Sequence, residues 1–133
     1  MELITRNSPK YRDLDLNFTA HPVSGDVTKL VGAEAVRRAV KNVILTNYYE
    51  RPFKPYYGSG VRGLLFENMN EQTIKLMVDR AALAIKNFEP RASILEIRAR
   101  GEPAKNGVTM TITFQLENIN EPIRVEIFLE RIR

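Results

Sequence analysis

The chain has 133 residues, a length that favours one domain with a core of its own. It contains no cysteine, which excludes disulfides, thiolate metal sites and cysteine nucleophiles. The formal net charge is +4, but acidic and basic residues are interspersed, a pattern typical of a solvated surface or a protein interface. No apolar run is long enough to span a membrane, and the first residues lack a secretion signal, so we expect synthesis in the cytoplasm.

The first part of the chain is predicted to be an arm, a strand and a loop, over residues 1–31. Residues 1–12 are polar and irregular, which favours an extended arm. Apolar and polar residues alternate from Asp13 to Ala20, which predicts a strand with one apolar side. A loop follows as far as Gly32. We expect residues 32–133 to form the main α+β unit, within a single domain overall.

Two segments have the apolar periodicity of helices. The first is predicted over residues 33–46. The second is predicted over residues 71–88, because Asn70 is a good N-cap and Glu71 places negative charge in the first turn. Its apolar stripe repeats at spacings of three and four: Ile74, Met77, Val78, Ala81, Ile85 and Phe88.

The remainder predicts three strands, over residues 95–100, 108–117 and 123–132. In the first, Leu95, Ile97 and Ala99 are expected on the buried face. Short connections imply an antiparallel meander, so the expected fold is α+β, with two main helices packed on one face of an antiparallel sheet of three to four strands. The third strand ends the chain and, at a sheet edge, would either accept a strand from another chain or be guarded by its charged residues.

A segment rich in aromatic residues, here called the aromatic loop, covers residues 48–60. Its prolines and glycines exclude a regular element, and we expect it to fold onto the core or to lie against a neighbouring protein. A short helical turn is predicted next, over residues 61–66. The five aromatic residues are Tyr48, Tyr49, Phe53, Tyr56 and Tyr57.

The segment Glu89-Pro90-Arg91 stands where the second helix must end. Proline favours an extended backbone at Glu89, so Glu89 and Arg91 are expected to project from the same side of a stiff corner. A carboxylate in this place opposes the helix dipole, which suggests a role in binding a partner. The alternative is internal: Arg91 covers the last helix carbonyls and Glu89 pairs within the chain.

Most kinds of catalytic site lack candidates, and no cofactor or metal is expected. His21 is the single histidine and is predicted to be an ordinary loop residue. A muramidase stays open as an alternative, because glycoside hydrolysis needs only two carboxylates, and Glu50, Glu67 and Glu89 are candidates. Arginine neighbours, however, favour the ionised form, which does not suit a general acid. A small nucleic-acid-binding domain, using the aromatic loop, is the less favoured alternative.

Taken in order, a few motifs resemble one protein family: Arg51-Pro52-Phe53-Lys54-Pro55, Gly58-Ser59-Gly60, Leu64-Leu65-Phe66-Glu67-Asn68 and Asn87-Phe88-Glu89-Pro90-Arg91. This combination resembles the baseplate wedge proteins of contractile-tailed, T4-type phages, a family often labelled "lysozyme-like" that has relatives in type VI secretion baseplates. The resemblance extends over about residues 30–133.

The resemblance implies a structural protein of the virion, in the tail baseplate, assembled in the host cytoplasm and without catalytic activity. Such a subunit joins the inner wedge and initiates polymerisation of the contractile sheath. The implied partners are other wedge proteins, through their helical core bundle, the tail sheath protein and, as a further candidate, the tail tube; no membrane, small-molecule substrate or nucleic acid is implied. The corresponding partner-binding residues are Glu89, Pro90, Arg91, Arg51, Pro52, Phe53, Ile123, Val125, Ile127, Phe128 and Leu129.

Overall fold

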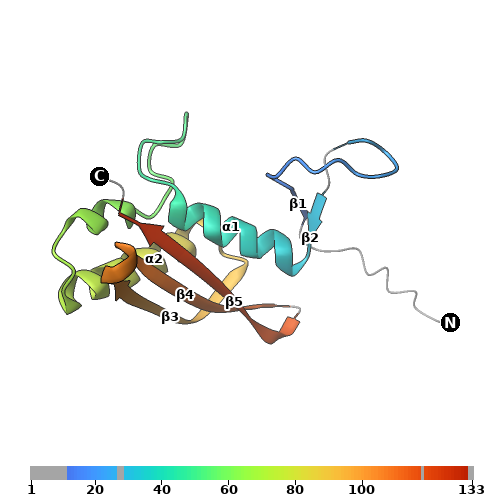
Figure 1. Ribbon diagram of the computed structural model, residues 1–133. Coiled ribbons are helices and arrows are strands. Elements are labelled where there is room, and N and C mark those ends of the chain that lie inside the picture. The colour runs from blue at the N-terminus through green and yellow to red at the C-terminus, as the bar shows by residue number, and fades with distance from the viewer. Residues whose placement is uncertain (1–11, 27–28, 118, 132–133) are drawn as a thin grey trace.

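The computed structural model of the protein describes residues 12–26, 29–117 and 119–131 (Figure 1). Three long strands form an antiparallel sheet in the order β3-β4-β5. They are β3 (Ala92–Glu102), β4 (Gly107–Leu116) and β5 (Ile119–Glu130); β3 and β5 are longer than the sequence predicts, and β4 is shifted by one residue.

Two helices cover one face of this sheet, α1 (Ala33–Leu45) and α2 (Glu71–Phe88). The 3₁₀-helix η1 (Arg62–Phe66) lies between them in the chain, where the short helical turn is predicted. The predicted α+β architecture is therefore confirmed. No helix among the described residues has both the length and the apolar content that a membrane crossing needs.

Alternating residues place the core on one side of the sheet. Ile97, Ile112 and Val125 stand in one row across the three strands, on the side that the helices cover. The next row, which includes Thr111, faces the opposite side. Because the side-chain period of a strand is two, one buried face selects this register over any register shifted by a single residue.

The second helix begins and ends at the predicted residues. The Asn70 side chain accepts a hydrogen bond from the backbone N–H of Thr73 at 2.8 Å, so it is the N-cap. Met77, Ala81 and Ile85 are fully buried against the sheet. Their spacing of four places them on one face of the helix, which explains why the pattern predicts this element so well.

The first strand of the sheet departs from the prediction at Leu95. The register between β3 and β4 shifts between Ile94 and Glu96, so Leu95 turns outward and is exposed instead of buried. A bulge of this kind inserts one extra residue and reverses the alternation on either side of it. Ile97 and Ala99 follow the bulge and face the core as predicted.

The strand predicted over residues 13–20 is mostly wrong. Strand β1 (Arg12–Leu14) ends after three residues, because Asp15 accepts hydrogen bonds from the backbone N–H groups of Asn17 and Phe18 and closes a turn. It pairs antiparallel with β2 (Lys29–Val31), inside the predicted loop, and the two strands form a hairpin beside α1 (Figure 1). Residues 1–11 of the predicted arm lie outside the described residues.

The end of the aromatic loop is tied to the end of α1. Ser59 is fully buried; its hydroxyl donates to the Ile44 carbonyl at 2.8 Å and accepts from the Val61 N–H. Gly58 has a φ of 129° and approaches the Thr46 carbonyl so closely that a Cβ there would overlap it. These contacts set where the aromatic loop leaves and rejoins the core.

Gly58→Ala should therefore destabilise the fold by about 2–4 kcal/mol, because it adds both a steric overlap and an unfavourable φ. Gly63→Ala is the matched control: nothing lies within 4 Å of its added methyl group, and the change should stay within about 0.5 kcal/mol. Urea denaturation of both variants measures this. Equal stabilities would show that Gly58 is not the point that fixes the loop.

Candidate partner-binding site

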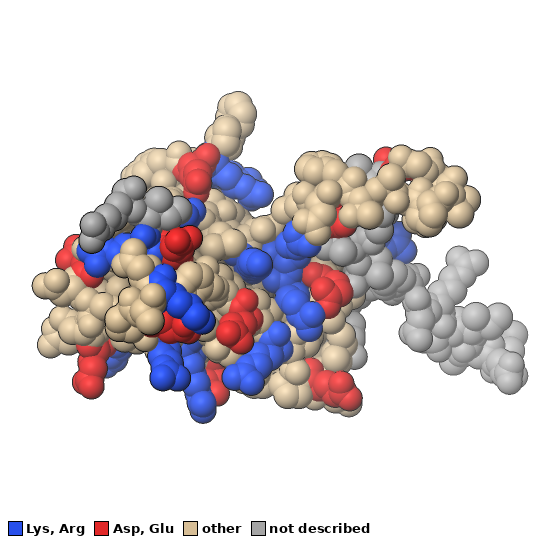
Figure 2. All heavy atoms as spheres, in the orientation of Figure 1, with Lys and Arg blue, Asp and Glu red and all other residues tan. Residues whose placement is uncertain are grey.

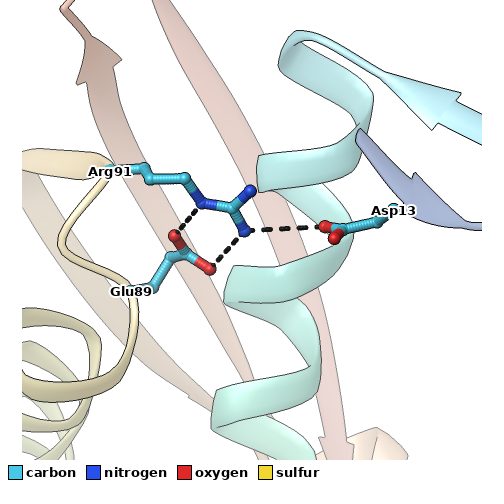
Figure 3. Close-up of polar contacts among 3 residues, drawn as sticks. All are labelled: Asp13, Glu89 and Arg91. Atoms are coloured by element: carbon cyan, nitrogen blue, oxygen red, sulfur yellow. Dashed lines mark hydrogen bonds and ion pairs between the residues drawn. The ribbon is translucent and has the colours of Figure 1, made fainter. Parts of the chain in front are cut away.

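The corner after α2 is built on a partly buried ion pair between Glu89 and Arg91 (Figure 3). Glu89 is 5% exposed, and its backbone N–H still donates to the Ile85 carbonyl at the end of the helix. Arg91 Nε and Nη2 bond the two carboxylate oxygens at 2.5 and 2.8 Å. This bidentate pair neutralises a carboxylate that the helix dipole disfavours.

Arg91 also reaches across to the N-terminal hairpin. Its Nη2 atom lies 3.5 Å from Asp13 Oδ2, so the guanidinium stands between two carboxylates from distant parts of the chain (Figure 3). The hydrogen bond to Glu89 raises the pKa of Arg91, which stays charged. Glu89 and Arg91 therefore lie side by side at the corner, but they do not both project from it: Glu89 is buried and only Arg91 is partly exposed.

The aromatic loop packs against this corner through Tyr57. The centroid of its ring lies 5.0 Å from that of the Phe88 ring, and the Arg51 guanidinium carbon lies over the Tyr57 ring, 4.2 Å from its centroid. Burial raises the pKa of the Tyr57 phenol; the nearby Arg51 cation acts in the opposite direction and Glu89 adds to the rise. Two of the sequence motifs, those around Arg51 and Glu89, thus meet in space.

The tip of the aromatic loop projects away from the core (Figure 1). Pro52 and Phe53 are exposed, and Phe53 buries none of its side chain although its φ is 65°, a value that costs energy for a bulky residue. Tyr49 and Tyr56 are also exposed, with ring centroids 6.2 Å apart. The base of the loop therefore folds onto the core, which is one of the two expectations for this segment, whereas the tip does not.

Strand β5 is far from this corner in the sequence. Its backbone edge is more available to a partner than most of its side chains. It is an edge strand, paired with β4 alone among the described residues. Phe128 is exposed on the outer face, where its ring covers Gly107. Ile132, the end of the predicted strand, lies outside the described residues. The four other predicted contact residues are buried in the chain's own core: Ile123, Val125, Ile127 and Leu129.

Two residues of this site lacked a sequence signal for their role. Asp13 lies in a predicted strand, and nothing local indicates a contact with Arg91, 78 positions further on. Tyr57 is one aromatic residue among five, and only the fold distinguishes it from the exposed ones. Both contacts depend on how separate elements pack, which periodicity within one element does not report.

Removing the buried carboxylate should be costly for folding. Glu89→Gln leaves Arg91 without its bidentate partner, and because Arg91 is partly exposed we expect a loss of about 1–3 kcal/mol, below the range for a fully buried pair. The control is Glu34→Gln, which breaks the exposed pair with Arg37 and should cost less than about 1 kcal/mol. Urea denaturation at neutral pH compares them; equal losses would contradict a structural role for Glu89.

Comparison of the sequence with known proteins identifies one family. Residues 31–121 match the family model described as baseplate wedge protein gp25. The baseplate wedge protein gp25 of Enterobacteria phage T4 is 27% identical over 101 residues, which cover 76% of this chain and 75% of the T4 protein.

Solved structures share the fold. A putative tail lysozyme from Geobacter sulfurreducens superposes with a TM-score of 0.67 at 23% identity, over 76% of this chain and 95% of that one. A chain of the anti-feeding prophage baseplate gives 0.63 at 18% identity, over 92% and 86% of the two chains. A chain of the pyocin R2 baseplate after contraction gives 0.53 at 17% identity, over 83% and 96%.

The family model covers more than half of the chain, including the aromatic loop, both helices and the Glu89-Pro90-Arg91 corner. This chain belongs to the gp25 family of baseplate wedge proteins, structural proteins of contractile tail baseplates.

Proposed function

We propose that this protein joins the inner wedge of a tail baseplate through its corner and aromatic loop, and starts polymerisation of the contractile sheath at the edge of β5. The position of β5 is the observation that supports the proposed start of sheath polymerisation. This strand lies at the sheet edge, and β4 is its single strand neighbour among the described residues. A free strand edge binds an incoming strand through main-chain hydrogen bonds.

The charged residues of β5 do not obstruct such pairing. Arg124, Glu126 and Glu130 alternate with the buried residues, so they stand on the outer face of the sheet, roughly perpendicular to the plane in which a strand would add. Pro122 lacks an N–H group but is tolerated in an edge strand. Residues 123–130 contain no proline. The guarding role that the sequence left open is therefore the weaker interpretation.

The opposite edge of the sheet is less suitable. The bulge at Leu95 interrupts the regular hydrogen-bonding row of β3, and bulges are one way in which proteins blunt an edge strand. The register of β5 shifts too, since Phe114 pairs with Ile123 and Leu116 with Ile119, but this leaves residues 123–130 in regular register and favours that part of β5 as the edge that accepts a strand.

The wedge contact is assigned to Arg91, Arg51, Pro52 and Phe53, with Glu89 and Pro90 shaping the corner. Phe53 is fully exposed at a loop tip with a strained backbone, a combination that stability does not explain and that a partner's pocket would. The helical core bundle of other wedge subunits is the proposed partner of this surface.

We infer that the protein does not hydrolyse peptidoglycan. Both oxygens of Glu89 are bonded to Arg91, and Glu50 Oε2 accepts a hydrogen bond from the Asn47 backbone at 2.7 Å. Neither carboxyl group is arranged to protonate a glycosidic oxygen while a second carboxylate faces it across a sugar. The lysozyme label of one structural relative concerns that protein.

Hydrogen exchange tests the role of β5. In the isolated chain, the backbone amides of residues 123–130 that point to the open edge, away from β4, should exchange fast. Addition of purified sheath protein should slow their exchange at least about tenfold. Residues 92–102 of the opposite edge are the internal control and should not change. Protection of β3 instead, or of neither strand while sheath assembles on complete baseplates, would contradict the assignment.

Peptidoglycan turnover tests the absence of catalysis. The folded chain at high concentration should release no soluble fragments from purified peptidoglycan over the rate of buffer alone, measured by the fall in turbidity and by chromatography of the products. Release that Glu67→Gln or Glu89→Gln abolishes, in variants shown to be folded, would establish a muramidase.

A further inference from the structure

An open pocket of about 590 Å³ lies between the N-terminal hairpin, α1, the aromatic loop and the corner after α2. Its wall is rich in guanidinium groups: four arginines line it, with one carboxylate. Figure 2 shows basic side chains gathered over α1 beside the hairpin, although acidic ones are interspersed over the rest of that face. The charged lining residues are Arg12, Arg38, Arg51, Arg91 and Asp13.

The arginines of this pocket differ in how far they are neutralised. Arg91 is held by Glu89, and Arg38 Nη2 lies 3.6 Å from Asp15. Arg51 forms no ion pair with any described residue; one face of its guanidinium lies on Tyr57, which leaves its N–H edges available. Even with Glu89 and Asp15 counted, the pocket therefore keeps an excess of positive charge.

Asp13 shows which chemical group fits. Its carboxylate lies 3.5 Å from the outer edge of Arg91, and its side chain is 39% exposed. The distance is long for a hydrogen-bonded ion pair, and exposed pairs contribute little, so this contact is weak. Asp13 also lies outside residues 31–121, the part of the chain that the family shares.

We propose that this pocket binds an aspartate or glutamate side chain from an acidic segment of another wedge subunit, and that Asp13 occupies part of the pocket until that segment arrives. The incoming carboxylate bonds the N–H edges of Arg51 and Arg91 and displaces Asp13. This inference rests on the proposed wedge contact and adds the chemistry of the partner and an internal competitor for it.

A protein carboxylate suits the pocket better than a polyphosphate chain. Guanidinium groups pair with both kinds of anion. However, Glu89, Asp15 and Asp13 place three carboxylates in or directly behind the pocket wall, and they would repel a run of phosphates more than a single side chain. On the face that Figure 2 shows, basic and acidic side chains are also mixed and form no basic stripe.

Affinity for the purified wedge subunits of the same baseplate tests the competition. Asp13→Asn should raise the affinity about two- to fivefold, the value of a weak exposed pair. Arg51→Gln should lower it about tenfold or more. Asp79→Asn, an exposed change on α2 of the same chemical kind as Asp13→Asn, is the control and should have no effect.

Cross-linking identifies the group that enters the pocket. In Arg51→Lys, a carbodiimide should join the introduced amine to a carboxylate of the wedge subunit, which mass spectrometry locates. Arg100→Lys, on an exposed position of β3 outside the pocket, is the matched control and should give no cross-link to that carboxylate. Cross-links from position 51 to Asp13 alone, in a formed complex, would overturn the proposal.

The outcomes separate this inference from the proposed function. If the wedge subunits do not bind the unmodified chain, the proposed wedge contact is wrong. If they bind it and the Asp13 and Arg51 variants with equal affinity, the contact stands and the pocket inference fails. Tight binding of a 20-nucleotide DNA that Arg51→Gln abolishes would make the pocket a phosphate site and would also overturn it.

Discussion

The bidentate bond between Glu89 and Arg91 is the interaction on which the site depends. It stands where α2 ends and β3 begins, and it places a buried carboxylate at the unfavourable end of a helix dipole together with the cation that compensates it. Tyr57 brings the aromatic loop to the same point and Asp13 brings the hairpin. Three segments distant in the sequence thus meet at the corner after α2.

The difference in burial gives the two charged residues different roles. Glu89 is almost inaccessible, so a partner cannot contact it without opening the corner, and its substitution acts first on folding. Arg91 is partly exposed and, beyond its bonds to Glu89, faces a pocket. The internal pairing expected for Glu89 and the partner contact expected for Arg91 are therefore compatible, whereas the sequence presented them as alternatives.

The sequence predicts best those features that repeat along one element. Helix α2 is predicted to the residue because Asn70 caps it, a stripe of residues spaced by three and four fills one face, and Pro90 prevents its continuation. Leu95 and the segment after Leu14 are predicted wrongly because a bulge and an aspartate turn interrupt an alternation that looks regular in the sequence. Neither interruption changes the composition of its segment.

The candidate site, too, combines features that the sequence predicts with features that it does not. The motifs that contain Arg51 and Glu89 are recognisable as motifs, but their meeting at Tyr57 is a property of packing between the aromatic loop and the end of α2. The contribution of Asp13 is even less accessible to sequence reasoning, because the hairpin that carries it forms from two three-residue strands with no strong pattern.

Under the proposed strand addition, the core limits how β5 would recognise the incoming chain. Ile123, Val125, Ile127 and Leu129 are committed to the interior, so an added strand meets the backbone edge and, on the outer face, Phe128 and its charged neighbours. Backbone hydrogen bonds supply affinity with little discrimination, and side-chain contacts supply the specificity of strand addition. Since three of the four outward residues from 124 to 130 are charged, selectivity for one incoming strand must come mainly from charge pairing around Phe128, not from buried apolar contacts.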